Sequence, residues 1–224
     1  MRISIVIPVF NEAGTMEATA ASLRQLQGKY EVVVVDGEST DDTVALARAC
    51  GLSVIAAARG RGQQMNVGAA ATHGDVLLFL HADTRLPPDA LSRLADALQA
   101  PEVCGGNFSL RFEGETVGAK ILTRIYPWLR MLGLIYGDSA IFVRRSAFEA
   151  VGGYRVIPLF EDCDLYQRLR RTGRFIRLQD CAITSSRRFE GRFLRTFVFW
   201  TALQVLYWLR VSPQRLARAY RRVH

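Results

Sequence analysis

Three apolar runs near the start of the chain each stop at a polar or acidic residue. The runs and the residues after them are Ile3–Val9 before Asn11-Glu12, Val32–Val35 before Asp36, and Val76–Leu80 before His81-Ala82-Asp83. Continuous Val/Ile/Leu runs are typical of parallel strands buried on both faces, and ligands of open α/β sheets bind beyond the carboxyl ends of such strands. The pattern therefore predicts a charged ligand at one edge of a parallel sheet.

The segments between these runs have the spacing of helices. Helices are expected around residues 16–26, 44–49, 61–72 and 87–98, and further strands around 30–35, 52–56 and 75–80. Ser39-Thr40-Asp41-Asp42 resembles a helix start, with Ser39 or Thr40 as the capping residue. Strands that alternate with helices predict a parallel sheet with right-handed crossovers.

Beyond Pro101 the alternation changes, and a mixed sheet is expected. Asn107–Phe112 alternates like an exposed strand, residues 116–132 have helical spacing, and Ala140–Val143 reads as another strand. A helix over Glu161–Arg171 and two short strands near 174–178 and 181–184 should complete the body. We expect one domain over residues 1–190 and a helical tail over 191–224.

The net charge of +8 lies entirely in residues 187–224. From position 187 to the end there are nine arginines and a single acid, Glu190, so the first 186 residues are neutral overall. A neutral body with a basic tail indicates an enzyme-like domain that meets an anionic surface, such as phospholipid or nucleic acid.

The tail also contains a strongly apolar segment. Only Thr201 and Gln204 interrupt Phe197–Leu209, which is about 13 residues long, whereas a membrane span needs roughly 20. Two interpretations stay open: a helix packed on the body or on a second copy of the chain, and a helix lying in a membrane interface.

The cysteine and histidine residues bear on the cellular compartment and on zinc binding. The four cysteines form no C-x-x-C pair, the three histidines lack zinc-ligand spacing with them, and no signal segment precedes the first strand. A reducing cytoplasm is expected, with the inner face of a membrane as a peripheral location.

Four motifs in order resemble family 2 glycosyltransferases of the GT-A fold over roughly residues 2–190. The motifs are Val6–Glu12, Val34–Asp41, Leu80–Asp83 and Pro158–Asp162. The resemblance implies a Rossmann-like, mixed and mostly parallel α/β sheet that binds a nucleotide-diphosphate sugar. Arg59–Gly68, Tyr136–Asp138 and Thr184–Arg188 are similar to the subgroup called radical-SAM/selenodomain-associated transferase 2, some members of which are labelled arsenosugar-biosynthesis transferases.

Asp36 is the candidate for recognising the base. A carboxylate at a strand end can accept a hydrogen bond from an imide N–H, and the resemblance implies that Pro8, Phe10 and Glu12 form the neighbouring wall. The alternative is that Asp36 merely caps the following helix.

Asp83 is the candidate metal ligand. It stands where the family presents the last acid of Asp-x-Asp, whose carboxylate holds a divalent ion against the two phosphates, and Mg²⁺ or Mn²⁺ prefers such oxygens. His81 replaces the first acid, which predicts a weaker ribose or second metal contact than the family pattern implies. The alternative for His81 is a buried strand-end histidine bonded to backbone.

Arginines are the candidates for holding the phosphates. Arg59 and Arg61 stand in a glycine-rich loop before a helix, where guanidinium groups and a helix N-terminus can bind phosphate. The alternative is a solvated turn. Arg187 and Arg188 are candidates to cover the leaving diphosphate, unless they simply begin the basic tail.

Glu161 and Asp162 are the candidate catalytic pair. The resemblance implies that the second acid, Asp162, is the base that takes a proton from the acceptor hydroxyl, with Glu161 as its neighbour or an acceptor contact. Single displacement would invert the anomeric centre, and Asp138 is a candidate for orienting the acceptor. The alternative is that both acids only complement a helix dipole.

The sequence therefore predicts an inverting hexosyltransferase that uses Mg²⁺ or Mn²⁺ and a UDP-, GDP- or dTDP-linked sugar. The expected acceptor is small or lipid-linked, an anionic membrane or a second copy of the chain is a candidate partner, and no nucleic acid is expected. Two other classes of protein fit parts of the sequence. A sugar-phosphate nucleotidyltransferase needs a glycine-rich loop with Arg and Lys after the first strand, where this chain has Pro8–Glu12. A non-catalytic membrane-surface protein explains the tail but not the acids at the sheet edge.

Overall fold

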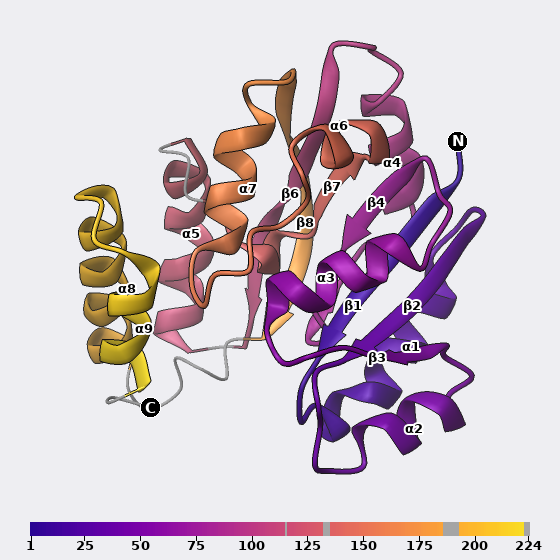
Figure 1. Ribbon diagram of the computed structural model, residues 1–224, viewed down its shortest axis with the longest axis horizontal. Helices are drawn as coiled ribbons and strands as arrows, with labels where there is room; N and C mark the ends of the chain where they lie inside the picture. Colours follow the sequence, from indigo (N-terminus) through magenta and orange to yellow (C-terminus); the bar gives the residue numbers. More distant parts are fainter. Residues whose placement is uncertain (115, 132–134, 186–192, 222–224) are drawn as a thin grey trace.

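A single mixed sheet runs through the protein (Figure 1). The computed structural model describes residues 1–114, 116–131, 135–185 and 193–221. Its eight described strands lie in the order β3-β2-β1-β4-β7-β6-β8-β5. They are β1 Ile3–Val9, β2 Tyr30–Asp36, β3 Val54–Ala56, β4 Val76–Phe79, β5 Thr84–Arg85, β6 Val103–Glu113, β7 Ile141–Arg144 and β8 Arg174–Ser185.

The sheet is parallel in its first half and mixed in its second. The pairs β1–β2, β1–β4, β2–β3 and β6–β8 are parallel, whereas β7 runs antiparallel to both β4 and β6, and β5 runs antiparallel to β8. The parallel first half and the mixed second half confirm the predicted fold class.

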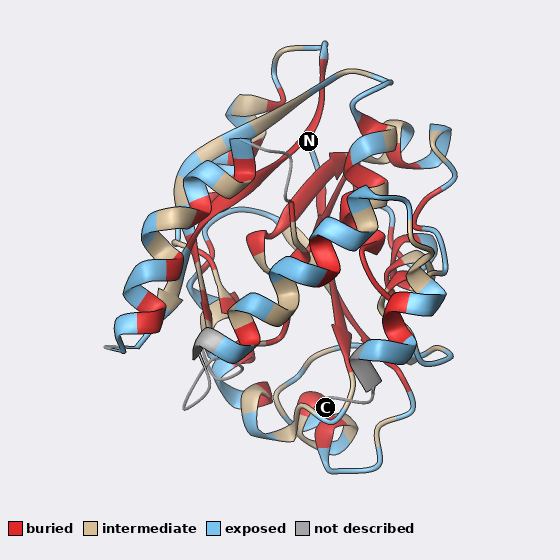
Figure 2. Cartoon of the chain, turned by 90° about the vertical axis from the view of Figure 1, so that its left-hand side faces the viewer, coloured by how far each residue is buried: buried red, intermediate tan, exposed pale blue. Residues whose placement is uncertain are grey.

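Helices cover both faces of this sheet. One face packs against α1 Met16–Gln25, α2 Thr43–Ala49, α4 Ala90–Ala97 and α5 Val117–Met131. The other face packs against α3 Arg61–Ala70, α6 Arg145–Ala150 and α7 Glu161–Leu169. Figure 2 shows the strands as the buried centre, with exposed residues on the outer sides of the helices.

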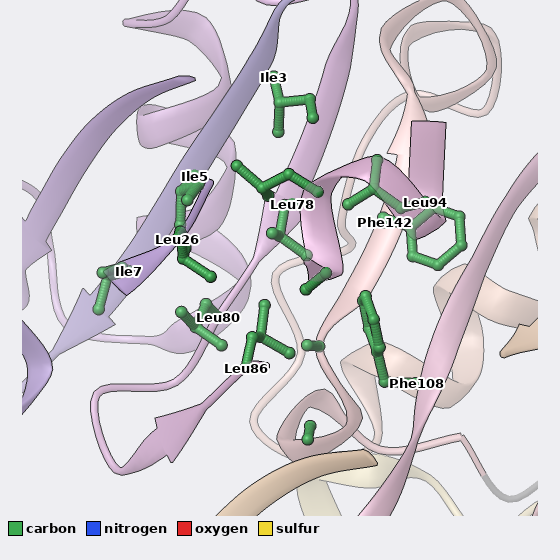
Figure 3. Packing of buried hydrophobic residues seen from close by; sticks show 14 of the residues in the cluster. Ile3, Ile5, Ile7, Leu26, Leu78, Leu80, Leu86, Leu94, Phe108 and Phe142 are labelled. Atoms are coloured by element: carbon green, nitrogen blue, oxygen red, sulfur yellow. The ribbon is translucent and has the colours of Figure 1, made fainter. Parts of the chain in front are cut away.

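Successive residues of the central strands supply two separate cores. Ile5 and Ile7 point to the first face, where they join Leu78, Leu94 and Phe142 (Figure 3). Val6, Leu77 and Phe79 point to the second face. The alternation follows from the two-residue period of a strand, and it explains why β4 is apolar at every position and β1 at every position except Ser4.

The second half of the sheet and its helices differ from the sequence prediction in four elements. β6 is longer than Asn107–Phe112 and is buried from Val103 to Leu110, because it lies between β7 and β8 and has helices on its faces. The two short strands predicted near 174–178 and 181–184 are one strand, β8, with a register shift opposite Asn107–Ser109. The short β5 and α6 were not predicted.

Two terminal helices, α8 Phe193–Trp208 and α9 Pro213–Arg221, pack on the body near α5 and α7 (Figure 1). Leu203 and Leu216 are buried against Leu159 and Phe160, and Phe160 stacks on Tyr207 with ring centroids 4.6 Å apart. Among the described helices, none combines the length and apolar character needed to cross a membrane. Of the two interpretations of the apolar segment, the structure shows the first in part: one face of α8 packs on the body.

Candidate active site

The carboxyl ends of β1, β2 and β4 lie at the same edge of the sheet because these strands run parallel. Asn11 and Glu12 follow β1, Asp36 ends β2, and His81 and Asp83 follow β4. The predicted gathering of polar residues at one sheet edge is therefore present in the fold.

Asp36 is buried, and one of its two carboxylate oxygens is committed to the local turn. The Ser39 backbone N–H donates to Asp36 Oδ2 at 3.1 Å, while the buried Oδ1 has no hydrogen-bond partner among the described residues. A buried carboxylate oxygen that accepts nothing is costly, which makes Oδ1 a suitable acceptor for a ligand N–H.

Ser39 and Thr40 do not cap a helix, and this part of the sequence prediction was wrong. Helix α2 begins at Thr43 after Asp42. The Ser39 hydroxyl instead accepts from the Asn11 N–H at 2.9 Å, and the Asn11 side-chain oxygen accepts from the Thr40 N–H at 2.8 Å. These bonds tie the loops after β1 and β2 together, and Asn11 and Glu38 both take positive φ values, 53° and 67°, to allow it.

The predicted base wall lies beside these loops. Pro8 is buried inside β1 opposite Val35, and the Arg59 guanidinium sits 3.9 Å from the centroid of the Phe10 ring. The Glu12 backbone N–H donates to Thr43 Oγ1 at 2.8 Å, which fixes the loop to the start of α2. Arg59 is thus placed with the base wall by its cation–π contact.

Asp162 and Glu161 begin α7 and are almost completely buried, at 4% and 1% exposure. Phe160, the residue before them, has a φ of 65°. Arg61 Nε lies 2.6 Å from Glu161 Oε1, and the Gly137 N–H donates to Asp162 Oδ2 at 2.9 Å. Acids that only complement a helix dipole stay in solvent, so this burial does not fit the dipole interpretation.

The environment of Asp162 changes its acidity. Burial, then the nearby charge of Glu161, raises the pKa of Asp162 to about 6, although Arg61 and His81 oppose the shift. Asp162 Oδ1 is buried and has no hydrogen-bond partner in the described part of the chain. A carboxylate with a raised pKa and an unsatisfied oxygen has the properties of a general base.

His81 pairs with Asp138. His81 Nδ1 lies 2.6 Å from Asp138 Oδ1, and His81 is 7% exposed. Burial opposes a charge on His81, but its hydrogen bond and charge attraction to Asp138 outweigh burial, so the pKa of His81 is raised. The His81 Nδ1 atom therefore contacts a side chain, whereas the alternative interpretation of His81 expected a hydrogen bond to the backbone.

Gly137 was missed by the sequence analysis, although its motif was noted. A Cβ at this position would lie 2.5 Å from His81 Nε2 and 2.8 Å from Asp162 Oδ2. Only glycine lets the backbone pass between these two side chains and donate its N–H to Asp162. Gln64 was also missed: its Nε2 donates to the carbonyls of Val9 and Val35, each at 2.8 Å, and joins the ends of β1 and β2.

A cavity of about 350 Å³ opens beside these groups. Its polar end is formed by Arg61, Asp83, Asp138 and Asp162. The structure thus brings four of the candidate site residues to one pocket. Asp36, Pro8, Phe10, Glu12 and Arg59 lie at the neighbouring strand ends and are not among its described lining residues. Arg187 and Arg188 lie outside the described residues.

Comparison with known proteins identifies the family. Residues 4–152 match the model of the family described as Glycosyl transferase family 2. The chain therefore belongs to glycosyl transferase family 2, as its motifs predicted.

Curated relatives are similar to parts of the chain. An undecaprenyl-phosphate 4-deoxy-4-formamido-L-arabinose transferase of Sodalis glossinidius is 37% identical over 46% of this chain and 36% of its own length. An uncharacterized protein of Mycobacterium tuberculosis is 32% identical over 75% of this chain and 61% of its own. The chain thus spans between about a third and three fifths of these relatives.

Among solved structures, a mannosyltransferase from Pyrobaculum calidifontis in complex with GDP-Man and Mn²⁺ superposes with a TM-score of 0.74 at 20% identity. That match covers 91% of this chain and 61% of the other. Glucosyl-3-phosphoglycerate synthase from Mycobacterium tuberculosis, with Mn²⁺ and UDP, gives 0.62 at 22% identity, over 91% of this chain and 77% of the other. At these identities the likeness shows the fold.

We predict that Asp162→Asn raises the stability of the protein. Because the pKa of Asp162 is raised to about 6 by burial, its ionised form weakens the fold at pH 8. Removing the charge should add about 1–3 kcal/mol, a rise in melting temperature of at least about 2 °C. The gain should shrink as the pH falls from 6 towards 4, because wild-type Asp162 is then protonated in the folded protein.

Thermal unfolding at pH 8, 6 and 4 measures this effect, with Asp164→Asn as the control. Asp164 lies 3.0 Å from Arg155 and 2.7 Å from Arg168, so loss of its charge should lower the melting temperature. A lower melting temperature for Asp162→Asn at pH 8 would contradict the assignment of Asp162 as a strained, buried charge.

Proposed function

We propose that this chain transfers a sugar from a nucleotide diphosphate to a hydroxyl group, with inversion at the anomeric carbon. The observation that carries the proposal is Asp162, a buried carboxylate with a raised pKa and an unpartnered oxygen among the described residues, at the polar end of an open pocket. Family membership supports it, because it supplies the reaction class that such a base would serve.

The proposed donor site extends along the sheet edge from β2 to β4. Asp36 Oδ1 accepts a hydrogen bond from the base, and Phe10 with Arg59 over its ring forms the adjoining surface. Arg61, which lines the pocket beside Asp83, faces the diphosphate. Arg61 is fixed by its ion pair with Glu161, whose charge together with nearby acids raises the pKa of Arg61 and keeps it cationic.

A divalent ion fits this arrangement if the donor supplies most of its ligands. No group of three potential His, Cys, Asp or Glu ligands is found among the described residues, but Asp83 and Asp138 both line the pocket. Asp83 would hold Mg²⁺ or Mn²⁺, whose charge would neutralise the leaving diphosphate. Mn²⁺ is bound in two of the structural neighbours, with GDP-Man in one and UDP in the other.

The proposed reaction is a single displacement. Asp162 Oδ1 takes the proton from the acceptor hydroxyl while the hydroxyl oxygen bonds to the anomeric carbon. The bond from that carbon to the diphosphate breaks, and its electron pair leaves with the nucleotide. The Gly137 N–H on Oδ2 holds the carboxylate in place, and Asp138, held by His81, orients the acceptor.

The finer subgroup remains a proposal that rests on three motifs. We infer membership of the radical-SAM/selenodomain-associated transferases from Arg59–Gly68, Tyr136–Asp138 and Thr184–Arg188. The first motif has a structural explanation in part, since Met65 is buried in the core and Asn66 exchanges hydrogen bonds with Tyr154.

We also propose that the protein associates with an anionic membrane. Exposed apolar side chains lie on α5 and directly after α8: Trp128 and Met131 on α5 are 70% and 66% exposed, and Leu209, the residue after α8, is 70% exposed. Arg215 and Arg218 are exposed on the adjoining α9. Aromatic and apolar side chains beside arginines complement an anionic headgroup layer.

Nucleotide binding tests the donor site. We expect one of UDP, GDP and dTDP to bind, with an affinity that Mn²⁺ raises at least tenfold, in a calorimetric titration. Asp83→Ala should remove the effect of Mn²⁺, Asp36→Ala should weaken binding with and without Mn²⁺, and Asp96→Ala, an exposed acid on α4, should change neither. If none of the three nucleotides binds, the proposed function is wrong.

Turnover tests the base. We expect Asp162→Asn to bind nucleotide normally but to slow donor hydrolysis, with water as the acceptor, by about 10²–10⁴-fold. Because Asp162 must be ionised to accept a proton and its pKa is about 6, the wild-type rate should fall below pH 6. A wild-type rate that is flat from pH 8 to 5, or a variant with full activity, would assign the base elsewhere.

Vesicle sedimentation tests the membrane proposal. We expect binding to vesicles with 30% phosphatidylglycerol but not to pure phosphatidylcholine, and Arg215→Glu with Arg218→Glu should weaken it at least tenfold. The control, Lys29→Glu with Arg48→Glu, makes the same charge change at exposed sites on the body. Equal loss in both variants, or a stable dimer by light scattering that binds no vesicles, would refute it.

A further inference from the structure

Most of the pocket beside Asp162 is apolar. Away from its polar end, its walls come from α5, from α8 and from the loop before α7. The wall residues include Leu122, Leu129, Leu159, Phe197, Trp200 and Val205. A volume of about 350 Å³ is in the range of pockets that hold small organic ligands.

Such walls do not suit a purely polar acceptor. A sugar or other polyol that entered between α5 and α8 would lose water from its hydroxyl groups and find few partners. A hydrocarbon chain in the same place loses no hydrogen bonds and buries apolar surface on both sides. The walls therefore select an acceptor that is apolar away from its reacting end.

Gln204 adds a polar contact inside this apolar section. It is 4% exposed and lines the pocket, and its Oε1 accepts from the Tyr136 hydroxyl at 2.9 Å. Its Nε2 has no hydrogen-bond partner in the parts of the chain that the structure describes. A buried amide donor without a partner is costly, and a ligand oxygen would satisfy it.

The polar end of the pocket favours a neutral reacting group. Asp83, Asp138 and Asp162 line it together with Arg61, and Arg61 is already paired with Glu161. In the proposed function Arg61 and Asp83 serve the donor diphosphate and its metal, so an acceptor phosphate would face Asp138, Asp162 and the negatively charged donor. A phosphate also needs no base to react, whereas an alcohol needs the base that Asp162 provides. The polar end of the pocket therefore favours a lipid alcohol over a lipid phosphate.

We propose that the pocket between α5 and α8 binds an amphipathic acceptor, with a hydroxyl group at Asp162, an oxygen near Gln204 Nε2, and a linear apolar chain along the two helices. The inference rests on the proposed function and names its acceptor class: a neutral, hydroxyl-bearing lipid. Figure 1 shows α5 and α8 at the same end of the molecule.

Binding of simple alcohols tests the pocket without knowledge of the donor. We expect n-hexanol, n-octanol and n-decanol to bind one molecule per chain in calorimetric titrations, roughly threefold to fourfold tighter for each added methylene. n-Decyl phosphate should bind at least tenfold more weakly than n-decanol. A phosphate that binds as tightly as the alcohol would overturn the assignment of a neutral head.

Two neighbouring residues on α8 give a matched pair of variants. Val205 lines the pocket and is 43% exposed, while Leu206 is 40% exposed and is not among the described lining residues. Val205→Glu should weaken n-decanol binding at least tenfold, and Leu206→Glu should leave it within twofold. Because both side chains are partly exposed, both variants should fold, which melting temperatures verify.

Nucleotide titration of the same variants separates this inference from the proposed function. Both variants should bind nucleotide like the wild type, since neither position is at the donor site. Equal weakening of n-decanol binding in both variants indicates adsorption to the surface and overturns the pocket. Nucleotide binding without saturable alcohol binding overturns the acceptor class alone, whereas loss of nucleotide binding in the wild type overturns the proposed function itself.

Discussion

The ion pair between Arg61 and Glu161 joins the two halves of the fold at the active site. Arg61 is the first residue of α3 and Glu161 the first residue of α7, so one contact of 2.6 Å fixes the starts of two helices that are 100 positions apart in sequence. Glu161 is 1% exposed, and removal of its partner would leave a buried charge without compensation. The position of Asp162, the adjacent residue, depends on this pair.

The acids of the site, of which Glu161 and Asp162 are buried and Asp138 is half-buried, are each held by a different kind of partner. Glu161 has the guanidinium of Arg61, Asp162 has the Gly137 N–H, and Asp138 has His81. The supports restrict the chain locally: Gly137 leaves no room for a side chain, and Ala140 and Phe160 take φ values of 51° and 65°. Strain of this kind persists only where the surrounding structure fixes it, and here it flanks the residues with proposed chemical roles.

The sequence predicted the parallel half of the fold well, because buried parallel strands have a plain signature. The runs that became β1, β2 and β4 are apolar at consecutive positions, and their ends placed Asp36 and Asp83 at one edge. The mixed half of the sheet was harder to predict from the sequence. β6 is buried by strands that come later in the chain, so its burial is a tertiary property that local alternation does not report.

Within the site, the sequence identified acids but not what holds them. Gln64 joins β1 to β2 through two backbone carbonyls that lie 55 and 29 positions away in sequence. Gly137 fits between His81 and Asp162, and its hydrogen bond to Asp162 spans 25 positions. His81 was read as a departure from Asp-x-Asp that weakens the site. In three dimensions His81 holds Asp138, and Asp138 lines the same pocket as Asp83. A second carboxylate, from a distant part of the chain, therefore lines the same pocket as Asp83, and the histidine at the motif position is paired with it.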